Sequence, residues 1–456
     1  MRAVFALLLV ITLAHHADAA TKLAIGRTER YRLPNGLEVI LQQDRRQPRV
    51  AVVMIYDVGH RDEPHGYAGI AHLIEHLTYR GSRHAPPLAA MTLLEAAGAN
   101  EINAGLGDDR TMYYALLPAS SLELALWIEA DRMAFVLEHL ETKSLLLERA
   151  VVLNELRERQ TPTRLFQDHI ARTLYPESHP YAPPESEAED VAATELRHVQ
   201  WFFQKTYRPD NACLSMVGDF DVDATKAMVK RYFATIGRPP GRPTRPAGAP
   251  LVFSGKQRIT IAAPYSRERL AMLWPVPGPE TADAAALHLA ASALGDGPVS
   301  RLHRRVVDAA GSASSIATDI EHLDLVSWFD IGAELAHDRT HAEVEGAIDR
   351  EIRRLQSEPV TADELRALKR NTIMQIALAH EHLLARALLL GVSARSRDRK
   401  LYDPNHEIGR IEAVTSAAVL RAAQRHLRLD RRLVAWMKSD SNAPINGRIT
   451  HSSGRL

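Results

Sequence analysis

The chain has 456 residues, of which 46% are hydrophobic, and its 56 lysine and arginine residues balance its 56 aspartate and glutamate residues. This length predicts two or more domains, each large enough to bury a core of its own. A formal net charge of zero gives no bulk attraction to nucleic acid or to an anionic membrane, so we expect neither as a partner. The single cysteine, Cys213, excludes an internal disulfide and, in an apolar run, is typical of a buried core thiol.

The first residues are typical of an export signal. Arg2 precedes the apolar stretch 3–14, which is too short to span a bilayer, and the Ala-Asp-Ala sequence at 17–19 matches a cleavage site. We therefore expect a signal peptide over residues 1–19 and a periplasmic protein in a bacterial cell envelope. The alternative is an uncleaved membrane anchor. No cysteine lies near the cleavage site, which argues against a lipoprotein, and no later stretch is long and apolar enough to cross a membrane.

Two predicted strands within residues 37–59 lead to a helix that carries candidate metal ligands. The segment 68–79 has helical periodicity and contains a His-x-x-Glu-His motif. On a helix, His72 and His76 lie one turn apart on the same face with Glu75 beside them. Two such imidazoles can bind one zinc ion, and the carboxylate can take a proton from water bound to the metal. The alternative is a chance match, because the chain has 21 histidines.

A second charged helix, predicted over residues 145–160, offers partners for this motif. Glu148 and Glu155 lie two turns apart on one face of it. A catalytic zinc needs three protein ligands and one open position for water, so Glu155 is a natural third ligand. Glu148 is a natural hydrogen-bond partner that orients a ligand. For each residue, the alternative is a solvated glutamate on a helix surface.

These segments resemble the pitrilysin or insulinase family of zinc metallopeptidases, which carry the inverted His-x-x-Glu-His motif. The resemblance is greatest to small bacterial members that are similar to mitochondrial processing peptidase subunits. It covers nearly the whole mature chain and is most specific in the first half, where the matching segments are GHRDEPHGYAGIAHLIEHLTYRGS, INAGLGDDRTMYYALLP, ERAVVLNEL, HPYAPP and RPDNACLSMVGDFD.

The resemblance implies a zinc-dependent endopeptidase that cleaves peptides or unfolded segments, with one Zn2+ per chain. It assigns the metal ligands to His72, His76 and Glu155. It assigns the catalytic roles to Glu75, as general base, and to Glu148, which orients a ligand. Asn103 and Ala104 stand in the place of the family's Asn-Ala pair, so we expect this strand to pair with an extended substrate by β-addition.

A stretch rich in proline, glycine and arginine, residues 238–250, divides the mature chain into two halves. We expect a zinc-binding domain over 20–237, an inactive second domain over 251–440 and a flexible tail over 441–456. Strand-like runs and a helix at 281–295 repeat the order of the first half, which predicts a duplicated fold. Each domain is expected to be α+β, a mainly antiparallel sheet with helices on one face. We expect the two domains to be hinged at the linker and to enclose a chamber together with partner domains.

The second half departs from the family at one point that matters for catalysis. Members that act alone carry an arginine and a tyrosine, seven residues apart, that reach the substrate carbonyl. The corresponding positions here hold Val307 and Ser314, although two arginines lie close to the first. No tyrosine occurs between Tyr265 and Tyr402. Loss of one donor to a developing oxyanion typically costs ~100–1000-fold in rate.

We therefore expect a catalytic subunit whose homologous partner supplies the arginine and the tyrosine. One alternative is that the pair is dispensable or replaced locally. Another is a peptide-binding or assembly subunit with little activity of its own, although such a subunit has no need of an intact zinc motif. A cofactor-dependent enzyme finds no support, because no glycine-rich phosphate loop lies between a strand and a helix.

Overall fold

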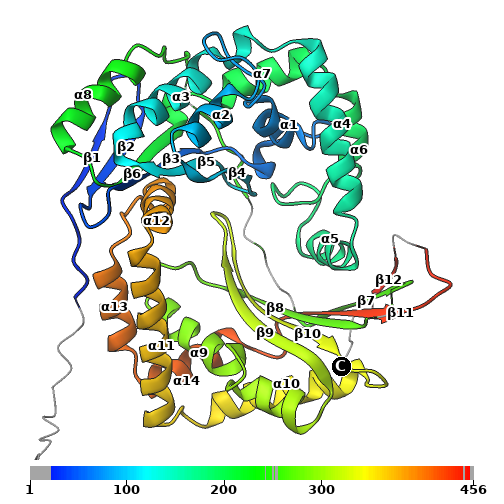
Figure 1. Cartoon of the computed structure of the whole chain (residues 1–456). Coiled ribbons are helices and arrows are strands. Elements are labelled where there is room, and N and C mark those ends of the chain that lie inside the picture. Colours follow the sequence, from blue (N-terminus) through cyan, green and yellow to red (C-terminus); the bar gives the residue numbers. More distant parts are fainter. Residues whose placement is uncertain are drawn as a thin grey trace, which may run out of the picture.

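Two six-stranded sheets, each with its own layer of helices, face each other across the molecule (Figure 1). This computed structural model describes residues 22–241, 243–248, 251, 255–265, 267–444 and 447–451. The predicted signal peptide lies outside these residues, so its cleavage stays a prediction.

The first half builds its sheet from six strands. These are β1 (Thr28–Arg32), β2 (Glu38–Gln43), β3 (Arg49–Tyr56), β4 (Asn100–Leu106), β5 (Thr111–Pro118) and β6 (Ala212–Gly218). Its helices are α1 (Ile70–Leu77), α2 (Ala89–Ala96), α3 (Leu122–Phe135), α4 (Thr142–Glu158), α5 (Pro162–Leu174), α6 (Glu187–Ala193), α7 (Leu196–Thr206) and α8 (Val222–Phe233). A short 3-10 turn, η1 (His60–Asp62), precedes α1.

The second half has the same kind of composition. Its strands are β7 (Gln257–Ala263), β8 (Arg269–Val276), β9 (Ala313–His322), β10 (Ser327–Leu335), β11 (Leu433–Ser439) and β12 (Arg448–His451). Its helices are α9 (Ala284–Gly295), the π-helix η5 (His303–Ala309), α10 (His341–Ser357), α11 (Ala362–Glu381), α12 (Leu383–Arg395), α13 (Pro404–Ala413) and α14 (Ser416–His426).

The strand orders show that the fold is duplicated. The sheets run β1-β2-β6-β3-β5-β4 and β12-β7-β11-β8-β10-β9, so five positions correspond in order of sequence and only the first edge strand differs in origin. Each sheet contains one parallel pair, β2 with β6 and β7 with β11, and its other pairs are antiparallel. The predicted α+β class, with two mainly antiparallel sheets, is therefore confirmed.

In addition, one helix of each half packs on the sheet of the other half. Along β3, Val52 and Met54 pack on the helices of their own half, whereas Val53 and Ile55 pack on α12. In the same way, α5 of the first half packs on the inner face of the second sheet. The prediction of helices on one face thus holds for each half's own helices. The opposite face of each sheet is covered by the helix from the other half. Because β3 is therefore buried on both faces, its sequence is an uninterrupted apolar run.

The exchanged helix α12 lies very close to the first sheet. Gly391 makes this possible, because a Cβ at that position would stand 2.5 Å from Ile55 Cδ1.

No single helix in the described ranges is long and apolar enough to cross a membrane. The bent pair α11–α12 reaches that length and composition, but α12 packs on the first sheet as a core helix.

The expectation of a flexible tail over 441–456 is wrong in one part. Residues 448–451 form β12, which pairs antiparallel with β7 and completes the second sheet. The polar, aperiodic sequence hides this strand because its stability comes from the free backbone groups of the β7 edge rather than from its own side chains. The last residues, 452–456, lie outside the described part of the chain.

Candidate metal centre

The helix that carries the motif, α1, begins at a strongly capped end. Gly69 adopts the left-handed conformation at its N-cap, and the Glu63 carboxylate accepts hydrogen bonds from the backbone amides of Gly69 and Ala71 at 3.0 and 2.9 Å. These bonds satisfy amide groups that a helix start leaves unpaired, and the negative charge suits the positive end of the helix dipole. The position of α1, and with it of both motif histidines, is therefore well defined.

Three side chains from α1 and α4 converge at one point. Nε2 of His72 lies 3.4 Å from one oxygen of Glu155, and Nε2 of His76 lies 3.5 Å from the other oxygen. One ligand atom of each of the three residues lies within 4.8 Å of the other two. The packing of Leu145 and Val152 in the first core brings Glu155 to this place.

Glu148 is buried and contacts Nδ1 of His76, the ring nitrogen opposite the one that faces Glu155. Nδ1 of His76 and Oε2 of Glu148 are 2.9 Å apart, and Arg80 donates to the other carboxylate oxygen. Burial opposes ionisation of Glu148, but these two hydrogen bonds hold the pKa of its carboxyl below the ordinary value. With its Nδ1 proton held by Glu148, His76 presents the Nε2 lone pair to the cluster.

The donor set suits a zinc ion. Burial, and next the charge of His76, lowers the pKa of His72 to about 3, so this imidazole is neutral at physiological pH, as a metal ligand must be. Two imidazole nitrogens and one carboxylate oxygen are a ligand combination found in catalytic zinc sites. His72, His76 and Glu155 therefore fit the metal, and their role as its ligands stays a prediction.

Glu75 and the Asn103-Ala104 pair line the same cavity, which has a volume of about 600 Å³. Burial raises the pKa of the Glu75 carboxyl, against the opposing charge of His76. A carboxylate with a raised pKa is better suited to accept a proton near neutral pH. Asn103 and Ala104 lie on β4, the edge strand of the first sheet, so one side of this strand has no neighbour within the sheet.

The positions that correspond to the family's arginine and tyrosine lie in the second half. Val307 is in the π-helix η5 and is partly buried against the second core. Ser314 lies in β9, is exposed, and donates from its hydroxyl to the Glu334 carbonyl at 3.4 Å. Neither side chain lines the cavity of the three candidate ligands.

Three residues around this cavity were missed from the sequence. Arg159 lies one helical turn beyond Glu155, and its guanidinium stands 3.0 Å from Oε2 of that residue. Arg80 is one turn beyond His76 and reaches Glu148. Both spacings are visible in the sequence as residues four apart on a helix. His60 carries no such signal, because its place in the cavity depends on the fold of η1.

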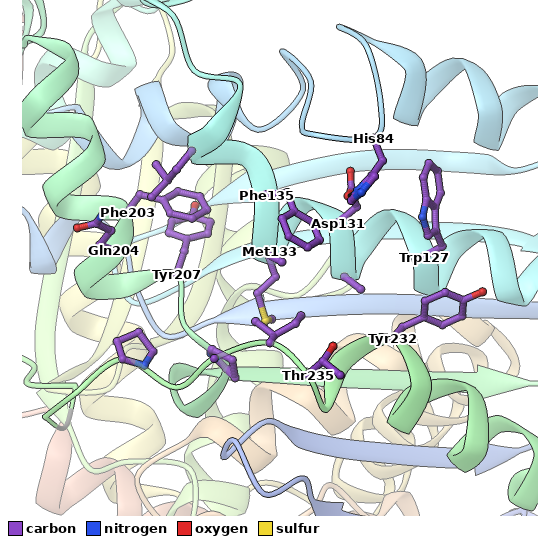
Figure 2. A pocket seen from close by; sticks show the side chains of 17 residues that line it. His84, Trp127, Asp131, Met133, Phe135, Phe203, Gln204, Tyr207, Tyr232 and Thr235 are labelled. Atoms are coloured by element: carbon purple, nitrogen blue, oxygen red, sulfur yellow. Dashed lines mark hydrogen bonds and ion pairs between the residues drawn. The ribbon is translucent and has the colours of Figure 1, made fainter.

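Two further cavities have linings that differ from that of the candidate metal cavity. A larger one of about 1300 Å³ lies between the halves, adjoins the first at His60, and takes part of its wall from β9. A separate cavity of about 520 Å³ lies among α3, α7 and the segment after α8, with aromatic walls that include the stacked rings of Phe203 and Tyr207 (Figure 2). It contains none of the candidate zinc ligands.

Comparison with known proteins gives consistent results for both halves. Residues 38–181 match the family described as insulinase (peptidase family M16), and residues 195–372 match the peptidase M16 inactive domain. The chain is 29% identical over 313 residues to an uncharacterised zinc protease of Mycobacterium tuberculosis, which covers 67% of this chain and 69% of that protein.

Two solved structures share the fold. The crystal structure of a protease from Helicobacter pylori superposes with a TM-score of 0.82 at 22% identity, over 91% of this chain and all (100%) of that one. The periplasmic protease PqqL from Escherichia coli superposes with a TM-score of 0.74 at 17% identity, over 92% of this chain but 48% of the longer protein.

Proposed function

Because this chain belongs to the insulinase family, peptidase family M16, we propose that it is a zinc-dependent endopeptidase that acts on peptides or unfolded segments. The observation that carries the proposal is the convergence of His72, His76 and Glu155 within 4.8 Å, in a cavity that also holds Glu75. Relatives named zinc proteases support the choice of metal.

The roles of the residues follow from their positions. The zinc ion, when bound, supplies a Lewis acid that polarises water and the scissile carbonyl. Glu75 accepts the proton of the attacking water and then delivers it to the nitrogen of the leaving amine. Glu148 keeps the His76 ring in one tautomer and one orientation. The free edge of β4 at Asn103 pairs with the backbone of an extended peptide, which holds the scissile bond beside Glu75.

A homologous subunit is proposed to complete the site. Where single-chain members have an arginine and a tyrosine, Val307 has no side-chain donor, the Ser314 hydroxyl donates to the Glu334 carbonyl, and neither residue lines the metal cavity. A partner whose second half faces this chain's first half supplies both groups to the oxyanion. The match of this chain to 48% of a longer protease supports an arrangement of two such units.

The second candidate function is a peptide-binding or assembly subunit with little activity of its own. The observation that favours it is the absence of the arginine and the tyrosine at Val307 and Ser314. The two candidates differ in turnover rather than in metal content, because a binding subunit stays inactive even when a partner is added.

Zinc content provides the first test. The mature chain is expected to bind about one zinc ion, and His72→Ala, His76→Ala and Glu155→Gln are each expected to lose most of it. Glu148→Gln is expected to weaken binding by about 10–100-fold, since it acts through His76. Elemental analysis after dialysis measures the metal, with Glu158→Gln, an exposed glutamate of the same helix, as the control. Zinc retained by all three ligand variants would contradict the assignment.

We further propose that the mature protein works in the periplasm. The export signal in residues 1–19 and the periplasmic location of the Escherichia coli protease PqqL support this. N-terminal sequencing of the protein from the envelope fraction is expected to begin near Ala20. A chain that keeps Met1 and stays in the cytoplasm would exclude this location.

A further inference from the structure

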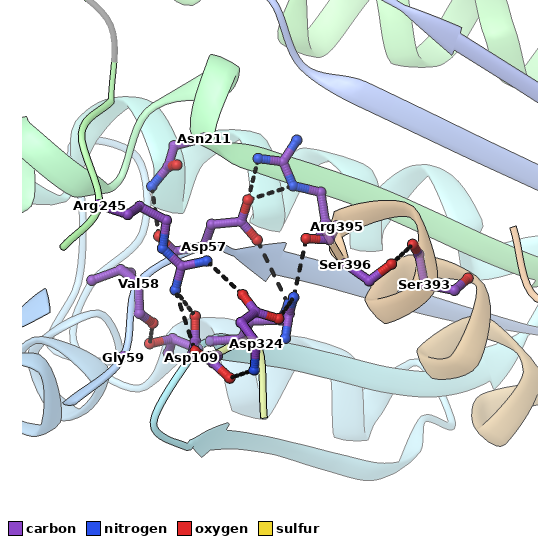
Figure 3. Close-up of polar contacts among 12 residues, drawn as sticks. Asp57, Val58, Gly59, Asp109, Asn211, Arg245, Asp324, Ser393, Arg395 and Ser396 are labelled. Carbon is purple, nitrogen blue, oxygen red and sulfur yellow. Dashed lines mark hydrogen bonds and ion pairs between the residues drawn. The ribbon is translucent and has the colours of Figure 1, made fainter. Parts of the chain in front are cut away.

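The two halves meet at a buried cluster of alternating charges (Figure 3). We call this cluster the interdomain clamp. It consists of four aspartates and four arginines: Asp57, Asp62, Asp109, Asp324, Arg61, Arg110, Arg245 and Arg395. None of these side chains is more than 18% exposed, so solvent screens their interactions weakly.

Two equivalent hairpin turns form the centre of the clamp. Asp109 lies in the turn between β4 and β5, and Asp324 lies in the turn between β9 and β10. Oδ2 of Asp109 accepts a hydrogen bond from the Asp324 amide at 2.8 Å. Arg110 donates to Oδ1 of Asp324 at 2.7 Å, while Arg61 donates to Oδ1 of Asp109 at 2.6 Å. The duplicated fold therefore joins its halves hairpin to hairpin.

The linker contributes one arginine that contacts both halves. Arg245 donates to Oδ2 of Asp324 at 3.1 Å and to the Asp109 carbonyl at 2.5 Å. Its Nη2 also lies 3.3 Å from Oδ2 of Asp62 in η1. One guanidinium thus ties the linker to two separate segments of the first half and to one turn of the second.

The exchanged helix α12 ends in the same cluster. Arg395, its last residue, donates to Oδ2 of Asp57 at 2.7 Å and to Glu38 at 3.1 Å. Arg110 donates to the Arg395 carbonyl at 3.0 Å. Most of these buried charges have two or more opposite charges within 4 Å, so removal of one weakens several ion pairs at once.

The clamp adjoins two edge strands that line different cavities. The Asp109 turn is continuous with β4, which lines the candidate metal cavity, and the Asp324 turn is continuous with β9, which lines the larger cavity. Both strands lie at the edges of their sheets. The two cavities adjoin at His60, so we expect a short peptide to stay within the metal cavity and a long one to reach β9 as well.

We propose that Arg245 and Asp324 are positioning residues for the peptidase reaction, which hold β9 at a set distance from the metal cavity so that a long peptide contacts both halves at once. This inference rests on the proposed function. The composition of the linker predicts a free hinge, but in this proposal the linker holds the two halves together.

Kinetics with two peptide lengths test this role in the mature, zinc-loaded chain. For Arg245→Gln, the ratio of kcat/KM for a long peptide to that for a short one is expected to fall about 10–100-fold, mainly through KM. Arg238→Gln is the matched control, because Arg238 is also in the linker but, among the residues that the structure describes, hydrogen-bonds to Asp210 of the first half alone, at 3.0 Å. An equal loss for both peptides, or the same loss in the control, would overturn the proposal.

A distance measurement tests the clamp without requiring turnover. Nitroxide labels on Lys143→Cys in α4 and Arg366→Cys in α11, both exposed, report the spacing of the halves, and Cys213 is buried and stays unlabelled. Arg245→Gln is expected to turn one narrow distance distribution into a broad one.

A second pair of variants distinguishes loss of the clamp from misfolding of the chain. Asp324→Asn is expected to broaden the distribution, whereas Asp338→Asn, an aspartate with an 87% exposed side chain in the turn after β10, is expected to leave it narrow. Distributions that stay narrow in both clamp variants would overturn the inference. If the unchanged chain has no peptidase activity even with its homologous partner present, the proposed function fails, and these distances still decide whether the clamp exists.

Discussion

Glu75→Gln is expected to leave the zinc content of the chain unchanged and to lower peptide turnover by at least ~100-fold. Glutamine has the shape of glutamate but accepts no proton, so the attacking water keeps its proton and the leaving amine receives none. The three candidate ligands are untouched by this change, because Glu75 points into the shared cavity without belonging to the cluster that binds the metal.

The measurement combines elemental analysis with initial rates on the same preparation. Glu95→Gln, an exposed glutamate on α2, is the matched control and is expected to retain both metal and rate. A Glu75→Gln chain with normal turnover would remove this residue from the mechanism, whereas loss of zinc would make it a part of the metal site.

The isolated chain, even when fully loaded with zinc, is expected to hydrolyse peptides slowly, and a homologous partner is expected to raise the rate by ~100–1000-fold. The first half can generate the nucleophile, but the second half contributes no arginine or tyrosine at Val307 and Ser314. The developing oxyanion therefore lacks donors until another chain brings them across the chamber.

Turnover at several concentrations, with and without the partner, measures this effect. Replacement of the partner's tyrosine by phenylalanine is expected to abolish the gain and to leave zinc bound to this chain. The Glu75→Gln chain mixed with unchanged partner is the control, and it is expected to stay inactive because the reaction takes place at this chain's site. High activity of the isolated chain, insensitive to any partner, would mean that another residue has replaced the pair.

Local sequence patterns allowed us to predict the helices and strands, the duplicated α+β architecture and the candidate site. His72, Glu75 and His76 share one helical turn, and Glu148 and Glu155 share one face of α4. Helical geometry places residues at such spacings side by side in any fold. The convergence of the two helices needed the resemblance to a family as well, since periodicity does not say which helices pack together.

Contacts between distant segments were decided by the tertiary structure alone. The exchange of α5 and α12 between the sheets, and the pairing of β12 with the edge of β7, depend on surfaces that exist only after each half has folded. In the sequence, the charges of the clamp look like ordinary solvated residues. They become partners because two hairpin turns and the linker meet at one place. Local periodicity therefore determined most of the elements and the candidate ligands, whereas long-range packing determined how the halves are held together.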